Sequence, residues 1–195
     1  MKTKVLVCII GGSGSGKSTL EDEIIIHDGF SKAISTTTRD RREGEHNGRE
    51  YHFVDVPSFL KLKENNELLE SVNFAGNYYG LTKSEFHKND DNLVFVVEPN
   101  GFMQITQYIK TNELNIATIV VYMDITEKER FKNMVKRGDN PIAIQERLKA
   151  ETIVFDFKKF GIVPDIRVTK LHSSTTETIM DDINKAIALI GTDKE

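Results

Sequence analysis

The stretch Gly11-Gly12-Ser13-Gly14-Ser15-Gly16-Lys17-Ser18 fits the pattern G-x-x-x-x-G-K-[ST] of a phosphate-binding loop. The apolar run at residues 5–10 predicts a buried strand before it, and residues 19–27 can form a helix after it. The pattern requires this context, because its glycines let backbone N–H groups turn toward phosphate oxygens at a helix N-terminus. A flexible Gly/Ser turn is the alternative, but it leaves the lysine, the serine and the flanking elements unexplained. We therefore expect a nucleoside triphosphate site.

Length and composition predict one globular domain with a full core. The chain has 195 residues, of which 38% are hydrophobic and 29% charged, as in ordinary folded domains. Its net charge of -4 argues against a nucleic-acid coat, and no apolar stretch is long enough to span a membrane. The single cysteine, Cys8, lies in the first apolar run and excludes a disulfide framework. We expect a cytoplasmic monomer or homodimer without a signal peptide.

Apolar runs alternate with helical patterns, which predicts a parallel sheet with helices on both faces. Further strands are expected at residues 33–37, 51–54, 93–97 and 116–123, and a hairpin around Gly76-Asn77. Helices are expected from Asp55 to about 64, from the Thr126/Glu129 capping box to about 136, from Asn140-Pro141 to about 157, and through 179–190 to Gly191. The segment of about 35–81 interrupts the alternation with short strands, so we expect an insertion with its own small sheet.

This insertion carries the densest chemistry of the chain. Residues 39–50 hold four arginines and four carboxylates, preceded by the hydroxyl residues 35–38 and followed by Tyr51, Tyr78 and Tyr79. A solvated charged loop is the plain alternative, since exposed ion pairs contribute little. Arginine forks and tyrosine hydroxyls, however, supply several fixed donors for a phosphate monoester. Glu70 is placed to accept adjacent N–H groups from a purine edge.

With these residues the chain resembles the guanylate kinases, which transfer a phosphoryl group from ATP to GMP. The resemblance is carried by residues 11–19, by 35–45 with Gly48 and 51–54, and by 67–70 and 74–80, in family order and spacing. It implies an α/β fold: a P-loop NTPase-type parallel sheet with helices on both faces, an inserted mixed-β NMP-binding subdomain and a small helical lid. The single domain would divide into a core of about 1–34, 82–132 and 148–195, an NMP-binding insertion of about 35–81 and a lid of about 133–147.

The resemblance also implies roles for individual side chains. ATP would be bound by Gly11, Ser13, Gly14, Ser15, Gly16, Lys17, Ser18 and Thr19. GMP would be bound by Ser35, Arg39, Arg42, Tyr51, Glu70, Tyr79 and Glu98. Lys17, Arg39, Arg137 and Arg147 would be catalytic, and Mg²⁺ would be held by Ser18, with Glu98 through water. Within the acceptor site, Glu70 would accept the guanine N1 and N2 protons and Ser35 would donate to O6.

The sequence departs from the family pattern at two places that concern binding of the acceptor nucleotide. Leu81 stands where the family usually has a serine or threonine that helps read guanine O6, and Thr82 follows it. Glu98-Pro99-Asn100 replaces the usual aspartates.

A third departure concerns the lid. Asn133 stands four residues before Arg137, where the family usually has an arginine, and leaves Arg130 or Lys132 as substitutes.

The expected reaction is ATP-dependent phosphoryl transfer to GMP and dGMP, giving ADP and GDP or dGDP. Leu81 and the altered 98–100 segment keep open a (d)NMP kinase of broader or altered base specificity. A catalytically inactive guanylate kinase-like interaction module is another alternative, although such modules usually lack an intact phosphate loop. A small-metabolite kinase would not need the constellation between residues 39 and 79.

Overall fold

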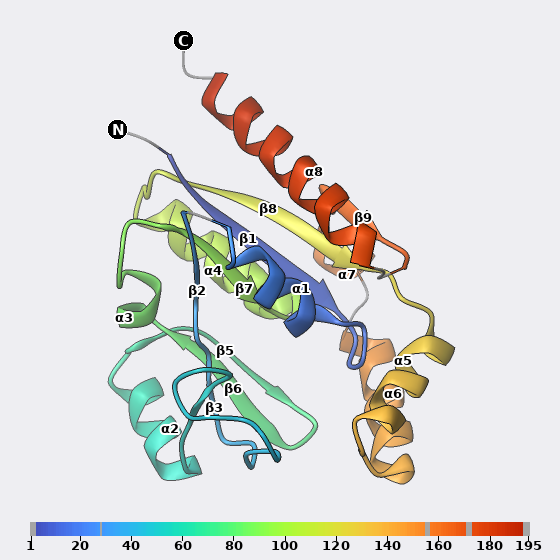
Figure 1. The fold of residues 1–195 in the computed structure, drawn as a ribbon. Helices are drawn as coiled ribbons and strands as arrows, with labels where there is room; N and C mark the ends of the chain where they lie inside the picture. Colours follow the sequence, from blue (N-terminus) through green and yellow to red (C-terminus); the bar gives the residue numbers. More distant parts are fainter. Residues whose placement is uncertain (1–2, 28, 155–156, 171–172, 193–195) are drawn as a thin grey trace.

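The computed structural model describes residues 3–27, 29–154, 157–170 and 173–192, and Figure 1 shows the fold. Its centre is a sheet of five parallel strands in the order β2-β7-β1-β8-β9. These are β1 (Lys4–Gly11), β2 (Phe30–Lys32), β7 (Asn92–Val96), β8 (Ile116–Met123) and β9 (Ile166–Val168). The predicted parallel sheet is confirmed.

Strand β1 supplies both hydrophobic layers of the core, because successive side chains point to opposite faces of a sheet. Val5, Val7 and Ile9 pack with α1 (Lys17–Ile24) and α8 (Ser173–Thr192). The alternate residues, from Leu6 to Ile10, pack with α4 (Pro99–Thr111) on the other face. Figure 1 shows α1 and α8 on one side of the sheet and α4 on the other, so the expected helices on both faces are confirmed.

A second, four-stranded sheet is formed by the segment that was expected to be an insertion. Its strands are β3 (Thr36–Thr37), β4 (His52–Phe53), β5 (Leu68–Phe74) and β6 (Asn77–Thr82), in the order β4-β3-β6-β5. The β3–β4 pair is parallel and the other pairs are antiparallel, so the sheet is mixed. Helix α2 (Val56–Glu64) begins at Asp55, whose carboxylate accepts from the Ser58 N–H as predicted for an N-cap.

Three further helices lie beside the carboxyl ends of the parallel strands (Figure 1): α5 (Glu127–Lys136), α6 (Pro141–Val154) and α7 (Phe157–Phe160). Thr126 Oγ1 accepts from the Glu129 N–H and caps α5, as the sequence predicted. Met134 and Ile144 are buried between α5 and α6. Among the described residues, no helix is both long and apolar enough to cross a membrane.

Several element boundaries differ from the sequence prediction. Residues 33–37 do not form one strand, because the chain leaves the main sheet after β2 and enters the second sheet only at β3. The hairpin strands β5 and β6 are longer than expected, and α6 ends at Val154 with residues 155 and 156 outside the described part. Helix α8 runs past Gly191 to Thr192. Helices α3 (Lys83–Phe86), α4 and α7 and the edge strands β2 and β9 were not predicted.

Candidate active site

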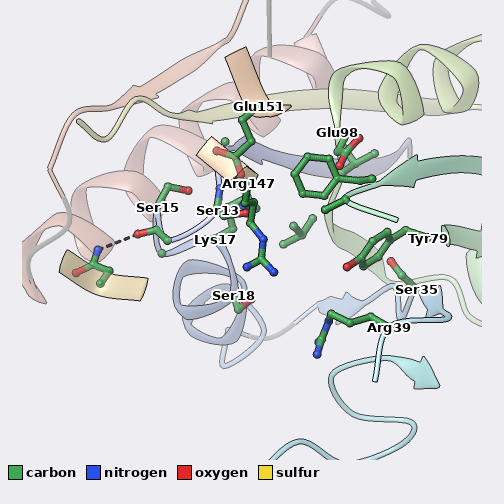
Figure 2. Close-up of a pocket in the computed structure, with 18 of the residues that line it drawn as sticks. Ser13, Ser15, Lys17, Ser18, Ser35, Arg39, Tyr79, Glu98, Arg147 and Glu151 are labelled. Atoms are coloured by element: carbon green, nitrogen blue, oxygen red, sulfur yellow. Dashed lines mark hydrogen bonds between the residues drawn. The ribbon is translucent and has the colours of Figure 1, made fainter. Parts of the chain in front are cut away.

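One cavity of about 600 Å³ lies between the phosphate loop, the second sheet and helices α5 and α6. Every residue that the sequence assigned to ATP, GMP or catalysis lines this cavity. Figure 2 shows Ser13, Lys17 and Ser18 toward one end and Ser35, Arg39 and Tyr79 toward the other. The geometry therefore offers two phosphate-binding ends that face one space.

The loop after β1 turns tightly into α1. Gly14 and Gly16 have φ values of 76° and 90°, a left-handed conformation that favours glycine. The Ser15 N–H donates to the Gly12 carbonyl at 3.2 Å, and Lys17 Nζ donates to the same carbonyl at 2.9 Å. Lys17 is thereby held over the loop at the N-terminus of α1, where an anion is stabilised by the helix dipole.

The ammonium group of Lys17 has a lowered pKa. Burial lowers the pKa of its ammonium group to about 8, with Glu151 and Glu98 opposing the shift and Arg130 and Arg137 adding to it. A lysine that is costly to keep charged gains much from an incoming anion, because the anion replaces the water that the lysine has lost. The loop is therefore suited to phosphate.

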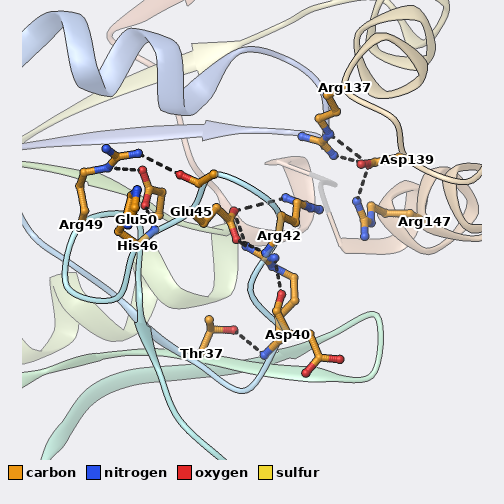
Figure 3. Close-up of polar contacts among 12 residues, drawn as sticks. Thr37, Asp40, Arg42, Glu45, His46, Arg49, Glu50, Arg137, Asp139 and Arg147 are labelled. Atoms are coloured by element: carbon orange, nitrogen blue, oxygen red, sulfur yellow. Dashed lines mark hydrogen bonds and ion pairs between the residues drawn. The ribbon is translucent and has the colours of Figure 1, made fainter.

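The acceptor end is built around Arg39, which is only 9% exposed. Its guanidinium donates to both oxygens of Glu45, at 2.8 and 3.0 Å, and Glu45 also accepts from the Arg42 N–H at 2.8 Å (Figure 3). The Tyr51 ring lies 5.4 Å from the Arg39 guanidinium carbon and packs edge-on against Tyr79, with 6.0 Å between ring centroids. These contacts fix two arginines and two tyrosines as a group, so the alternative of a loosely solvated charged loop does not describe this segment.

Glu70 lies on β5 at the same end of the cavity and is 4% exposed. Burial and the nearby Glu98 raise the pKa of its carboxyl to about 8. The Leu81 backbone N–H donates to this carboxylate, whereas Oε2 is buried without a protein partner among the described residues. A buried polar atom without a partner costs free energy. The carboxylate is therefore placed to accept further N–H groups from a ligand.

Glu98 follows β7 and precedes α4 without forming a side-chain cap to that helix. Burial raises the pKa of its carboxyl to about 7, with Lys17 opposing the shift and Glu151 adding to it. Glu98 lines the cavity and is close enough to both Lys17 and Glu70 to influence the pKa of each.

Leu81 lies in the core and its side chain is fully buried. Thr82 does not replace the missing hydroxyl, because its Oγ1 accepts from the Glu85 N–H and caps α3, and Thr82 does not line the cavity. Ser35 is therefore the only serine or threonine of the described cavity lining that lies outside residues 11–19.

Helices α5 and α6 bring Arg137 and Arg147 to the cavity. Both donate to Asp139 Oδ2, Arg137 at 2.6 Å and Arg147 at 3.3 Å (Figure 3). These two arginines and Arg39 help to lower the pKa of Arg42, although burial is the largest cause. Arg137 and Arg147 thus share one electrostatic environment with Arg39 and Arg42.

Neither Arg130 nor Lys132 substitutes for the arginine that the family usually has at the position of Asn133. Asn133 lines the cavity and its Nδ2 donates to the Gly14 carbonyl at 2.8 Å. Arg130 is paired with Glu151 and faces a separate small cavity, and Lys132 is exposed. Neither Arg130 nor Lys132 reaches the lining of the main cavity.

Three charged residues of the lining, Glu129, Glu151 and Lys170, were given no role in the site at the sequence level. Asp139, which does not line the cavity, was missed as well. Lys170 lines the cavity after β9, and Glu151 lines it beside the phosphate loop. Asp139 pairs with the two lid arginines. A signal existed for Glu151, which lies four residues after Arg147 on the same helix face.

The oxygen groups present fit Mg²⁺ bound largely through nucleotide phosphates. Ser18 is exposed in the first turn of α1, and Glu98 lines the same cavity. Among the described residues, no group of three or more acidic, histidine or cysteine side chains could hold a metal ion by itself. Mg²⁺ commonly uses one or two protein oxygens together with phosphates and water, so the two features agree.

Comparison with known proteins gives the family. A sequence model of the guanylate kinase family matches residues 2–163. The chain belongs to the guanylate kinase family. The assignment confirms the sequence prediction of a guanylate kinase-type, nucleotide-binding enzyme, which rested on three motif blocks within the first 81 residues.

Individual guanylate kinases agree with this family assignment. The enzyme of Clostridium tetani is 27% identical over 199 residues, covering 100% of this chain and 88% of its own. That of Zymomonas mobilis is 34% identical over 151 residues, covering 74% of this chain and 67% of its own. The crystal structure of guanylate kinase from Anaplasma phagocytophilum matches with a TM-score of 0.66 over 95% of this chain and 87% of that one. At 18% identity, this likeness supports the fold, a five-stranded parallel sheet with a separate mixed sheet.

Proposed function

We propose that the protein transfers the γ-phosphoryl group of ATP to GMP, and also to dGMP, giving ADP and GDP or dGDP. The observation that carries the proposal is the single cavity with a phosphate loop at one end and the Arg39–Glu70 group at the other. A triphosphate donor would occupy the end with the phosphate loop, and a monophosphate acceptor would occupy the end with Arg39 and Glu70, so this one cavity accommodates both substrates. Membership of the guanylate kinase family supports the same pair of substrates.

The acceptor's charge and base are recognised by different parts of the second sheet. Arg39, Arg42, Tyr51 and Tyr79 would bind the monophosphate, because they present several donors already held in place by Glu45 and by ring packing. Glu70 would accept from guanine N1 and N2, using the oxygen that lacks a protein partner. Adenine has no such pair of N–H groups, so the carboxylate favours guanine.

The donor end would hold ATP through backbone N–H groups and hydroxyls of residues 11–19 and the ammonium group of Lys17, while the Ser13 N–H is engaged by Glu151 and the Ser15 N–H by the Gly12 carbonyl. Arg39, Arg137 and Arg147 would surround the transferring group and balance the charge on its equatorial oxygens. Asp139 keeps the two lid arginines together at one point. Excluding water by closure of the lid and insertion would suppress simple hydrolysis of ATP.

Mg²⁺ is proposed as the metal cofactor, held by the Ser18 hydroxyl and, through water, by Glu98. When bound, it would supply positive charge that neutralises the phosphate oxygens of ATP.

We further propose the division into core (about 1–34, 82–132 and 148–195), NMP-binding insertion (about 35–81) and lid (about 133–147). The mixed sheet over residues 36–82 and the apolar contact between α5 and α6 support this division. A cytoplasmic location is proposed as well, in agreement with nucleotide substrates.

A coupled assay of ADP formation tests the acceptor. ATP and Mg²⁺ are supplied with each common NMP and dNMP in turn, and kcat/KM is compared. We expect GMP and dGMP to be used best. Exclusive use of a non-guanine acceptor would overturn the assignment of GMP while leaving the phosphoryl transfer intact.

A kinase of broader base specificity is the second candidate, and Leu81 favours it. Its buried side chain removes one hydrogen-bonding group from the base pocket, and Thr82 is engaged elsewhere. Losing one such group typically reduces discrimination by about 1–3 kcal/mol. Turnover of AMP or IMP within tenfold of GMP in the same panel would support this candidate.

A further inference from the structure

Arg130 of α5 and Glu151 of α6 form a buried ion pair beside the phosphate loop. The Glu151 side chain is 3% exposed and that of Arg130 is 14% exposed. The two residues line a small second cavity of about 160 Å³ together with Gly12. The proposed reaction assigns neither residue a role, although removing one partner of a buried pair is usually costly.

This pair is bonded directly to the phosphate loop. The Ser13 N–H donates to Glu151 Oε1 at 2.7 Å, and Arg130 Nη1 donates to the Ser13 carbonyl at 3.4 Å. One residue further along, Asn133 donates to the Gly14 carbonyl. The backbone of the first half of the loop is therefore fixed by side chains from two helices.

Glycines at positions 12 and 14 permit this close approach. A Cβ atom on Gly12 would collide with the Arg130 guanidinium and would lie 2.7 Å from Glu151 Oε2. A Cβ atom on Gly14 would lie 2.5 Å from the Arg130 carbonyl oxygen. These two glycines thus serve the packing of α5 and α6 against the loop, besides any contact with phosphate.

The pair also lies at the base of the proposed lid, residues 133–147. Arg130 precedes the lid by three residues and Glu151 follows it by four. The ion pair consequently joins the two ends of the lid to each other and to Ser13. No hydrogen bond or ion pair of Arg130 or Glu151 among the described residues reaches the second sheet, where the acceptor end lies.

We infer that Arg130 and Glu151 are positioning residues for the donor nucleotide: they hold Gly12–Gly14 in its phosphate-binding shape and tie it to both ends of the lid. The inference rests on the proposed function and adds residues to its donor site. It requires the two side chains to act as one unit, since each touches both Ser13 and the other. It also requires ATP to be affected much more than GMP.

The test compares Glu151→Gln, Arg130→Met and the double variant by steady-state kinetics with each substrate varied. We expect each single variant to raise the KM for ATP about tenfold, as for one lost charge-assisted hydrogen bond, and to leave the KM for GMP within twofold. The double variant should resemble the worse single variant, because the two losses are one event. Asp182→Asn, which breaks the exposed pair with Lys185 on α8, is the matched control and should change neither KM.

Three results would overturn the inference. Equal increases in both KM values together with a lower Tm would indicate a merely structural pair. Changes in the KM for ATP of opposite sign in the two single variants would indicate a simple charge effect rather than positioning. Unchanged kinetics in both variants would remove the role altogether.

Gly12→Ala keeps the test valid if a charge variant fails to fold. The added methyl group meets the flexible end of Arg130 and should displace it from Glu151 without removing either charge. The same increase in the KM for ATP is expected, and an unchanged value counts against the inference. Calorimetric measurement of ATP binding, without GMP, separates this result from failure of the proposed function. If the wild-type protein binds ATP tenfold more tightly than the variants but does not phosphorylate GMP, the assignment of GMP as acceptor is refuted and the positioning role of the ion pair is retained.

Discussion

Replacing Glu70 by glutamine should separate recognition of the base from stability of the fold. The substitution keeps the shape of the side chain and removes its charge. The Glu70 carboxylate is buried, lies near Glu98 and leaves Oε2 without a protein partner among the described residues. The glutamine NH₂ group would face the guanine N–H groups with a donor instead of an acceptor. The loss in kcat/KM should therefore be large for GMP and small for ATP.

The magnitude follows from the hydrogen bonds involved. A hydrogen bond to a charged group contributes about 1.5–3 kcal/mol, which corresponds to a fall of roughly 10- to 150-fold in kcat/KM for GMP. The KM for ATP should stay within about threefold, a factor worth less than one such hydrogen bond. Thermal stability should be maintained or increased, because the variant removes a buried carboxyl that repels Glu98.

The assay couples ADP release to NADH oxidation, with GMP varied at saturating ATP and then the reverse. Glu64→Gln, an exposed change at the end of α2, is the matched control. Equal losses for ATP and GMP, or a loss for GMP below threefold, would refute the argument that Glu70 reads guanine.

Other predictions concern the loop, the pH dependence and the core. Lys17→Ala should lower kcat by on the order of 100- to 1000-fold with an unchanged circular dichroism spectrum, because it removes a positioned charge at the donor phosphates; near-normal turnover would contradict the donor site. Since the pKa of Glu70 is about 8 and its carboxylate is the form that accepts guanine N–H groups, kcat/KM for GMP should rise from pH 6 to 8, and Glu70→Gln should lose this rise. The free energy of unfolding changes in the opposite sense. The folded state binds this proton more tightly than the unfolded state, in which the pKa of Glu70 has its ordinary value of 4.5. Urea titrations should therefore show that the stabilisation contributed by Glu70 falls as pH rises from 4.5 through 8 in the wild type, and that Glu70→Gln lacks this fall. Phe59→Ala should cost about 3–5 kcal/mol in urea unfolding, because the ring is fully buried and stacks on Tyr78; a loss below 1 kcal/mol would contradict this packing.

The sequence was sufficient to predict the three central strands of the main sheet, β1, β7 and β8, and both ends of the cavity, whereas the short edge strands β2 and β9 were not predicted. Continuous apolar runs such as 116–123 are typical of strands covered on both faces, and the capping residues Asp55 and Thr126 mark helix starts by local chemistry. The phosphate loop and the Arg39 block are likewise local patterns, so their residues could be named before their positions were known.

Features that depend on distant contacts could not be predicted in this way. Residues 33–37 have a strand composition, yet the partner strands of β2 and β3 belong to different sheets. Helix α4 is different, because it carries local signals that the sequence analysis missed: Pro99 in its first turn and apolar residues at helical spacing, Phe102, Ile105 and Ile109. Glu151 reaches Ser13 across 138 residues of sequence. Such pairings arise from topology and leave no local pattern.

The burial of Leu81 has a mechanical consequence for the enzyme. Leu81 and Leu69 belong to the same apolar cluster as Leu6 and Phe95 of the main sheet, so the two sheets share one core. Swinging the whole second sheet as a rigid body would expose these side chains, at about 1.5–3 kcal/mol for each. A less costly motion keeps β5, β6 and the Arg39 group, which packs on Tyr51 and Tyr79, in place and moves the proposed lid over them. In such a cycle, Glu70 and Arg39 would form a fixed acceptor site, and Arg137 and Arg147 would approach the phosphates as the lid closes.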